Sequence, residues 1–398
     1  NVSTLHVRVG RETPRQLWAT CAGHSSSWML GAGRVPLLRP RAVTWMACAS
    51  AEFMSDRNDL LSNVEYVQFG PEFQISLKNV VWPERVRRIS AGKYPVDDTE
   101  ATFGQEMGRW SVEEMERWGV EEMVWPGSLE ELTLPSLFNQ PIEGMTWPGS
   151  LEKLAFGRVF DKPVEKVSWP ASLLQLTFGE WFNRPIRGVT WPASLQQVTF
   201  GKAFRQAIEG VAWPASLLQL TFGEWFNQPI EGVVWPSSLQ QLTFGEWFNQ
   251  PIEGVVWPVS LQVLTFGGDF DEPIEGAIWS ESLQQVNFGK NFNQPIERVA
   301  WPPSLQRLTF GADFNQPITD TIWPVSLEEV TFGWSFDQGI EEVTWPDSLL
   351  EMTFGERFCQ PIEGVVWPAS LQQLAFGWFF NQPIECVAWP KFLRKLTI

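Results

Sequence analysis

The sequence predicts a mainly β solenoid, built from 22-residue coils with two short parallel strands per coil. Three observations support this fold class. Thirteen tryptophans, from Trp125 to Trp389, follow one another at intervals of 22 residues without an insertion. Serine stands three places after Trp in twelve consecutive units, from Ser128 to Ser370. Glycine follows the second aromatic residue of the unit eleven times, from Gly157 to Gly377. Identical spacing over this length indicates stacked repeats.

Each unit holds two segments with the period-2 pattern of a strand that is buried on one face. In one unit the first segment ends in Leu176-Thr177-Phe178, and the second ends in Val189-Thr190-Trp191. In both segments, two apolar residues flank one residue that faces outward. Glycine after Phe and proline after Trp then end each strand and turn the chain. We therefore expect two parallel walls of strands, stacked coil on coil.

Several repeated columns are predicted to have structural roles. The Asn of the Phe-Asn motif, as in Asn183, and the Ser after Trp-Pro are expected to bond backbone groups of their own turns. The Trp column is predicted to be core, because it shares a strand face with a buried Val. The Thr column, including Thr221, Thr243 and Thr265, is explained by β propensity. An ice-binding Thr ladder is the alternative, although each coil has one such Thr rather than two.

Composition restricts the classes of function. Forty-six acidic and 29 basic residues give a formal charge of −17, which disfavours binding to the phosphates of nucleic acid. The only histidines are His6 and His24, so no His-dependent catalysis or metal binding is expected in the repeats. The four cysteines lack the spacing of a metal site. No apolar run reaches the roughly 18 residues of a membrane-spanning helix. No cofactor, metal or catalytic residue is predicted.

An enzyme is not expected from this pattern. Catalysis requires acids and bases that converge in a cleft, whereas uniform coils supply repeating columns of the same residue. A carbohydrate-binding or carbohydrate-active β-solenoid is the alternative. Its sugar-stacking residues would be the second tryptophans of some coils, such as Trp225 and Trp247, which follow Phe-Gly in a predicted turn.

The candidate partner-binding site is the outward-facing residue directly before Trp, together with a glutamate three places earlier. The apolar track consists of Val234, Val256, Ile278, Ile322 and Val366, and the acidic stripe consists of Glu231, Glu253 and Glu275. An apolar row beside like charges is expected to receive a protein surface that is basic and partly apolar. The alternative is a solvated acidic face that keeps the array soluble. The oligomeric state is left open.

The run Phe-Asn-Gln-Pro-Ile, followed by Trp-Pro-x-Ser-Leu-x-x-Leu-Thr-Phe-Gly, resembles the FNIP repeat. The resemblance covers roughly residues 120–398, with Trp before Pro where the family usually has an aliphatic residue. That family belongs to the wider leucine-rich-repeat group. The resemblance therefore implies a leucine-rich-repeat-like solenoid that serves as a non-catalytic protein–protein interaction scaffold.

The chain is predicted to have three parts. Residues 120–398 form the regular repeat solenoid, and residues 54–119 hold degenerate repeats with a helical insert. Residues 1–53 contain 6 Arg, 2 Glu and no Lys, and they lack the 22-residue pattern. Three interpretations fit this basic segment: a cap, a targeting segment, or an annotation artefact. The compartment is unknown; the cytoplasm is favoured, and an organelle would follow from a targeting segment.

Overall fold

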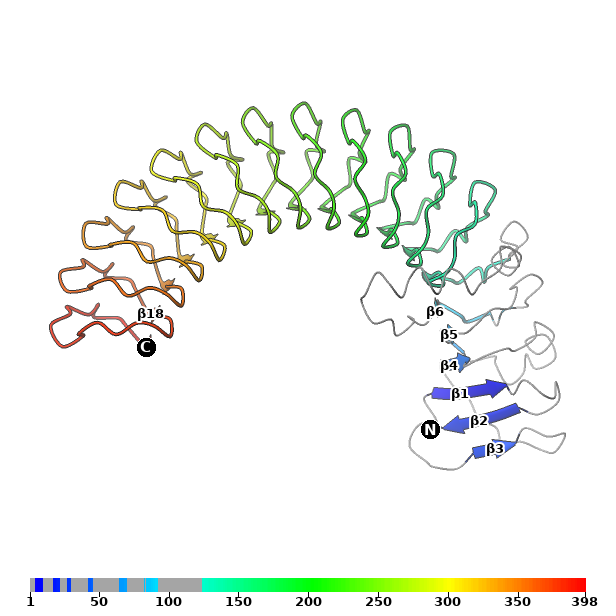
Figure 1. Ribbon diagram of the computed structural model, residues 1–398. Helices are drawn as coiled ribbons and strands as arrows, with labels where there is room; N and C mark the ends of the chain where they lie inside the picture. Colours follow the sequence, from blue (N-terminus) through cyan, green and yellow to red (C-terminus); the bar gives the residue numbers. More distant parts are fainter. Residues whose placement is uncertain are drawn as a thin grey trace, which may run out of the picture. The chain divides into compact units, whose positions relative to one another are not determined.

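Figure 1 shows the computed structural model of the 398-residue chain. It describes the backbone of four strands within residues 1–53, then residues 64–69, 82, 84–91 and the continuous stretch 124–398. The chain divides into two compact units, Asn1–Gly201 and Lys202–Ile398. All regular elements in the described part are strands, and none is a helix.

The first unit contains one sheet. Its strands are β1 (Thr4–Val9), β2 (Leu17–Cys21), β3 (Ser27–Met29), β4 (Ala42–Trp45), β5 (Tyr66–Phe69), β6 (Arg88–Ala91), β7 (Glu131–Thr133), β8 (Lys153–Ala155), β9 (Gln175–Thr177) and β10 (Gln197–Thr199). Strand β2 pairs antiparallel with β1 and β3. Strand β1 pairs in parallel with β4, and each strand from β4 to β9 pairs in parallel with the next.

The second unit continues the repeat with one strand per coil. Its strands are β11 (Gln219–Thr221), β12 (Gln241–Thr243), β13 (Val263–Thr265), β14 (Gln285–Asn287), β15 (Arg307–Thr309), β16 (Glu329–Thr331), β17 (Glu351–Thr353), β18 (Gln373–Ala375) and β19 (Lys395–Thr397). Neighbouring strands are parallel, and aligned residues such as Leu242 and Leu264 are one coil apart. Within this unit the strands lie along the inner side of the curved stack of coils (Figure 1). We call this side the strand wall.

The solenoid class is confirmed, but the second strand predicted for each coil is wrong. The segment ending in Val-x-Trp forms turns, and its backbone bonds stay within its own coil, as when the Val255 N–H donates to the Ile252 carbonyl at 3.3 Å. Proline stands on both sides of this segment, at Pro251 and Pro258, and lacks the N–H that a ladder requires. We call this side, from the Ile before the Glu-Gly turn to the residue after Trp-Pro, the Trp-Pro wall.

The coils enclose an apolar core in which equivalent side chains stack from coil to coil. Phe248, Leu261 and Leu264 are fully buried, and the Phe248 ring stacks on the equivalent Phe270 ring at 6.1 Å. The Trp column is part of this core, as predicted: Trp235 is only 7% exposed. One coil buries its side chains mainly against its neighbours, so the units can be stable only as a stack.

The Asn and Ser columns link successive coils, so the prediction that they bond their own turns is wrong. The side-chain oxygen of Asn249 accepts a hydrogen bond from the backbone N–H of Asp271, 22 residues later, at 3.0 Å. The Ser260 hydroxyl donates to the Leu239 carbonyl of the preceding coil at 2.8 Å. Both columns therefore satisfy loop backbone groups across the coil boundary, where the strand ladder does not reach.

The region before the regular coils follows the same ladder. Strand β6 pairs directly with β7, aligning Arg88 with Glu131, and the Trp82 ring stacks on Trp125 at 6.3 Å. The ladder therefore passes directly from β6 to β7. The predicted helical insert lies outside the described residues.

Candidate partner-binding walls

The structure places every residue of the apolar track on the surface of the Trp-Pro wall. The five side chains are between 74% and 80% exposed. Each lies between two buried residues, as Val256 does between Val255 and Trp257. The sequence pattern correctly predicted this outward orientation, although the local backbone is a turn rather than a strand.

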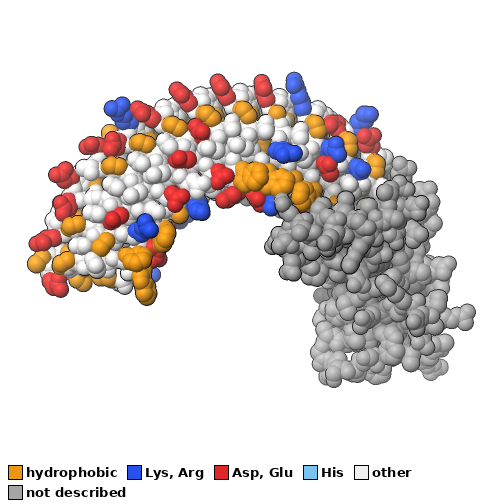
Figure 2. All heavy atoms as spheres, viewed as in Figure 1, with side chains coloured by type: hydrophobic (Ala, Val, Ile, Leu, Met, Phe, Trp, Pro, Cys, Tyr) orange, Lys and Arg blue, Asp and Glu red, His pale blue; other side chains and the backbone are white. Residues whose placement is uncertain are grey.

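The acidic stripe is exposed on the same wall. Glu231, Glu253 and Glu275 all lie at the surface, and Figure 2 shows acidic side chains in a row along the edge of the coils opposite the strands. Arg298 lies 3.6 Å from the Glu275 carboxylate, and both side chains are more than half exposed. An exposed ion pair of this kind contributes little to stability. The wall thus keeps acidic groups next to exposed apolar ones.

Two further apolar residues on this wall were not predicted. Val259 and Val325 occupy the position between Trp-Pro and Ser, and they are 74% and 80% exposed. The signal was available in the sequence, because this position holds Ala, Ser, Gly, Pro, Glu or Asp in most other coils. These valines widen the apolar track near Val256 and Ile322.

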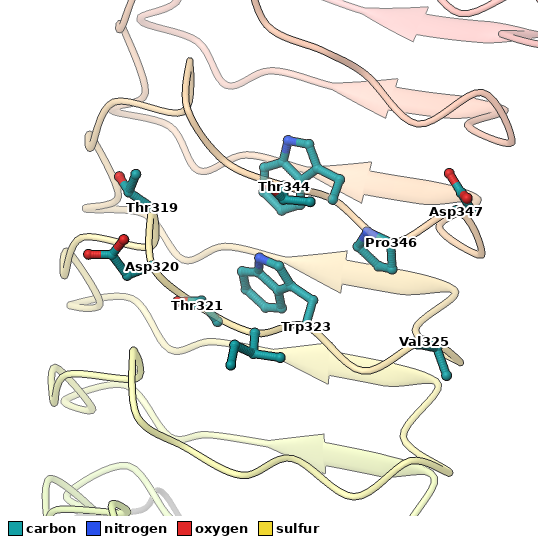
Figure 3. Close-up of a pocket in the computed structure, with 10 residues that line it drawn as sticks. Thr319, Asp320, Thr321, Trp323, Val325, Thr344, Pro346 and Asp347 are labelled. Carbon is teal, nitrogen blue, oxygen red and sulfur yellow. The ribbon is translucent and has the colours of Figure 1, made fainter.

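A hollow of about 510 Å³ opens on this wall between two coils (Figure 3). Its lining includes Ile322 of the apolar track and the exposed Val325. It also includes Asp320 and Thr321, two residues at which this coil departs from the repeat. Thr321 replaces the buried Val of neighbouring coils and is 5% exposed, and its hydroxyl has no hydrogen-bond partner. This coil therefore departs from the repeat at a buried position of the wall.

The hollow does not gather catalytic groups. Its two carboxylates, Asp320 and Asp347, lie at opposite ends in Figure 3. Among the described residues, no group of three His, Cys, Asp or Glu side chains could hold a metal ion. Cys359 and Cys386, the cysteines within the regular coils, are free thiols.

The strand wall presents a different, mostly neutral surface. Its outward positions are dominated by Gln and Thr, and Thr221, Thr243 and Thr265 are half-buried. In the first unit, the Glu131 carboxylate lies 2.9 Å from the Lys153 ammonium group. Hydrogen bonding and charge attraction from Glu131 raise the pKa of Lys153 above its usual value. Few apolar side chains are exposed along these strands.

A parallel strand wall on one side, irregular turns on the other and one aromatic core between them define a solenoid of the leucine-rich-repeat type. The FNIP Repeat family matches six segments of the chain, some of which overlap: residues 138–180, 206–247, 226–269, 248–279, 270–313 and 314–357. The chain is an FNIP repeat protein, as the resemblance of its motifs implied.

Solved structures with the same architecture include CroV588, described as a novel circular LRR protein. The two chains are 33% identical, with a TM-score of 0.57 over 92% of this chain and 60% of CroV588. This chain therefore spans less than two thirds of that protein. A chain of the Toll–Spatzle complex from Drosophila matches 96% of this chain and 50% of its own length, at 14% identity and a TM-score of 0.55. The latter likeness concerns the fold alone.

No relative was found among proteins with curated functions. Within the described part of the chain, no helix is long and apolar enough to cross a bilayer.

Proposed function

We propose that the protein is a non-catalytic scaffold for protein–protein interaction, and that its Trp-Pro wall binds a partner with a basic and partly apolar surface. The observation that carries this proposal is the apolar track. Soluble proteins expose isolated apolar side chains routinely, but aligned rows of them typify binding surfaces. Here β-branched side chains recur at the same exposed position, and nothing in their own coil covers them.

The acidic stripe gives the expected partner its charge. Glu231, Glu253 and Glu275 stand beside Val234, Val256 and Ile278 in three consecutive coils. A partner with Lys or Arg around an apolar ridge would complement both rows, and its association would weaken as salt screens the charges. Nucleic acid is not proposed as a partner, because the chain has a formal charge of −17.

The repeating geometry also favours binding over catalysis. The carboxylates of the Trp-Pro wall recur along the stack instead of converging, so the wall offers an extended surface with no acid–base pair. A carbohydrate-active solenoid would need such a pair. An ice-binding ladder would need a flat, exposed Thr array, whereas the Thr side chains of the strand wall are mostly half-buried.

The test is a triple substitution, Val234→Asp, Val256→Asp and Ile278→Asp, in the full chain. The expected result is loss of the proteins captured from native extract by the unchanged chain, with little change in melting, because all three side chains face solvent. The matched control replaces Thr221, Thr243 and Thr265 on the strand wall with Ser. If the control loses the captured proteins and the triple variant keeps them, the partner binds the other wall.

A further inference from the structure

In the second unit, the turns that follow the strands are stacked on one another from coil to coil. We call the two residues between the strand-ending Gly and the buried Phe the post-strand turn. These turns are joined by backbone hydrogen bonds from coil to coil: the Trp247 N–H donates to the Glu224 carbonyl at 2.8 Å, and the Asp269 N–H donates to the Glu246 carbonyl at 2.7 Å. A Cβ added at Gly245 would overlap the carbonyl oxygen of Gly223. The backbone is therefore closely stacked, and the side chains of the turns project from it in two rows.

These two rows vary far more than the apolar track. The pairs are Lys202-Ala203, Glu224-Trp225, Glu246-Trp247, Gly268-Asp269, Lys290-Asn291, Ala312-Asp313, Trp334-Ser335, Glu356-Arg357 and Trp378-Phe379. The residue before the core Trp, by contrast, is only Ala, Val, Ile or Thr in the same coils. A constant backbone with variable side chains suits a surface that determines what is bound.

Two neighbouring turns combine a pair of stacked indoles with acidic groups. The Trp225 and Trp247 rings lie 5.5 Å apart at an angle of 22°. The Trp225 indole N–H donates to the Glu224 carboxylate at 3.2 Å. In Figure 2, hydrophobic side chains gather at the strand edge of the coils with acidic side chains beside them.

A cation of the chain itself occupies the first face of this stack. The Lys202 ammonium group lies 5.5 Å from the centre of the Trp225 ring and 3.2 Å from the Glu224 carboxylate. An indole face attracts a cation through its quadrupole, and a nearby carboxylate strengthens that preference. The stack therefore already holds one cation between an aromatic ring and an acid.

The second face of the stack lacks such a cation. Trp247 is 46% exposed, and no cation of the described residues lies over its ring. In the coil after Trp247, Gly268 is the first residue of its turn, as Lys202 is in the coil before Trp225. Gly268 has no side chain that could cover the Trp247 indole. The Glu246 carboxylate lies over Gly268, where a Cβ would overlap it. Asp269 adds a second carboxylate, which accepts a hydrogen bond from the Asn291 side chain at 3.0 Å.

Another coil pair shows that a guanidinium can approach a post-strand Trp from the following coil. The Arg357 guanidinium lies 5.0 Å from the centre of the Trp334 ring. Trp334 is the first residue of its turn and Arg357 the second residue of the next, so this pair is offset by one turn position from Trp247 and Asp269. Trp247 is the second residue of its turn; Glu246 precedes it, and Asp269 occupies the same position one coil later.

We propose that Trp247, Glu246 and Asp269 form a binding site for an arginine side chain of a protein partner. The planar guanidinium stacks on the exposed indole face, and its N–H groups donate to the two carboxylates. Arginine fits better than lysine, because its flat, weakly hydrated group can stack and form directed hydrogen bonds at the same time. This site is on the strand side, so it goes beyond the proposed function and holds whether or not the apolar track binds a partner.

The test measures binding of a short, labelled arginine-containing peptide to the full chain by fluorescence anisotropy, and by the NMR shift of the Trp247 indole N–H. Trp247→Ala is expected to weaken binding about tenfold. The double variant Glu246→Gln/Asp269→Asn keeps the indole and the Asn291 hydrogen bond but removes both charges, and a similar loss is expected. A peptide with citrulline in place of arginine, which is planar but uncharged, should bind at least about tenfold more weakly.

The matched control is Glu341→Gln/Glu342→Gln, which removes two exposed charges from the Trp-Pro wall outside the acidic stripe. It should change binding less than about twofold. Equal weakening by both double variants would mean that the peptide responds only to the overall negative charge, and would overturn the site. So would equal binding of the citrulline peptide, or no shift of the Trp247 indole at millimolar arginine peptide. A shift with a neutral oligosaccharide but not with the arginine peptide would assign the indole to sugar stacking.

Discussion

The strand wall and the Trp-Pro wall of one coil differ most clearly in their glycines. Gly245, at the end of β12, is buried, and a side chain there would overlap the backbone of the preceding coil. Gly254, in the turn that opens the Trp-Pro wall, has a φ of +75° and open space around its Cα. The first glycine is required by the neighbouring coil, and the second by its own backbone conformation.

This difference shows how the two walls are held together. The strand wall is joined by backbone ladders that bring successive coils into close contact. The Trp-Pro wall is joined by side chains, namely stacked indoles such as Trp323 and Trp345, whose ring centres lie 5.6 Å apart. Strands joined by a backbone ladder lie about 4.8 Å apart. The indole rings are farther apart than this, so coils can be more widely spaced on the Trp-Pro wall than on the strand wall. The wall with the looser backbone carries the apolar track, and the tighter one carries the arginine site that we infer.

The largest expected effect on stability comes from removing a buried indole of the Trp-Pro wall. Trp235→Ala is expected to lower the free energy of unfolding by about 3–5 kcal/mol, because it empties a buried site between two coils. The adjacent control, Val234→Ala, should change it by less than about 0.5 kcal/mol, since Val234 is 79% exposed. Urea unfolding measures both. Similar losses for the two variants would contradict the assignment of buried and exposed positions.

A second comparison uses the two glycines. Gly245→Ala should destabilise the array by roughly 3 kcal/mol, because the backbone of two coils must separate to admit a methyl group. Gly254→Ala should cost only about 1 kcal/mol, the strain of a left-handed backbone conformation in a non-glycine residue. The midpoints of urea unfolding report the difference. An equal effect would mean that the strand wall is not the more tightly packed side.

A smaller effect is expected for the polar links between coils. Asn249→Ala removes the acceptor of the Asp271 backbone N–H and should destabilise by about 1–2 kcal/mol. Asn249→Asp keeps an oxygen acceptor, as Asp271 itself does for the N–H of Asn293, and should change stability by less than about 0.5 kcal/mol. Amide hydrogen exchange at residue 271 distinguishes the two. Equal exchange rates in both variants would show that the link is unimportant.

The smallest effect on the regular coils is expected from deletion of residues 1–53. We propose that this basic segment is dispensable for folding of the repeat solenoid, because it has neither the 22-residue pattern nor the acidic charge. Strand β4 pairs in parallel with β5, so its removal exposes the β5 edge and should increase exchange there. Exchange in strands β11 to β19 should be unchanged. Aggregation or unfolding of the shortened chain would instead identify residues 1–53 as a required cap.

The sequence by itself determined the unit length, the buried columns and the exposure of the apolar track. These features follow from a pattern repeated with little change, since a residue type that recurs at one position in every coil has the same environment in every coil. Leu242, Phe248 and Trp235 are buried for this reason, and Val234 is exposed because it lies between buried neighbours.

Only the tertiary structure decided which half of the coil forms strands and which atoms join the coils. Both halves show the same alternation of apolar residues, so periodicity could not separate them. Pro251 and Pro258 were the available signal, because a segment bounded by residues without an N–H is a poor member of a central ladder. The partners of Asn249 and Ser260 lie in neighbouring coils, and no pattern within one unit specifies them. The open face of Trp247 likewise depends on the residue stacked one coil away, a contact that exists only once the solenoid has formed.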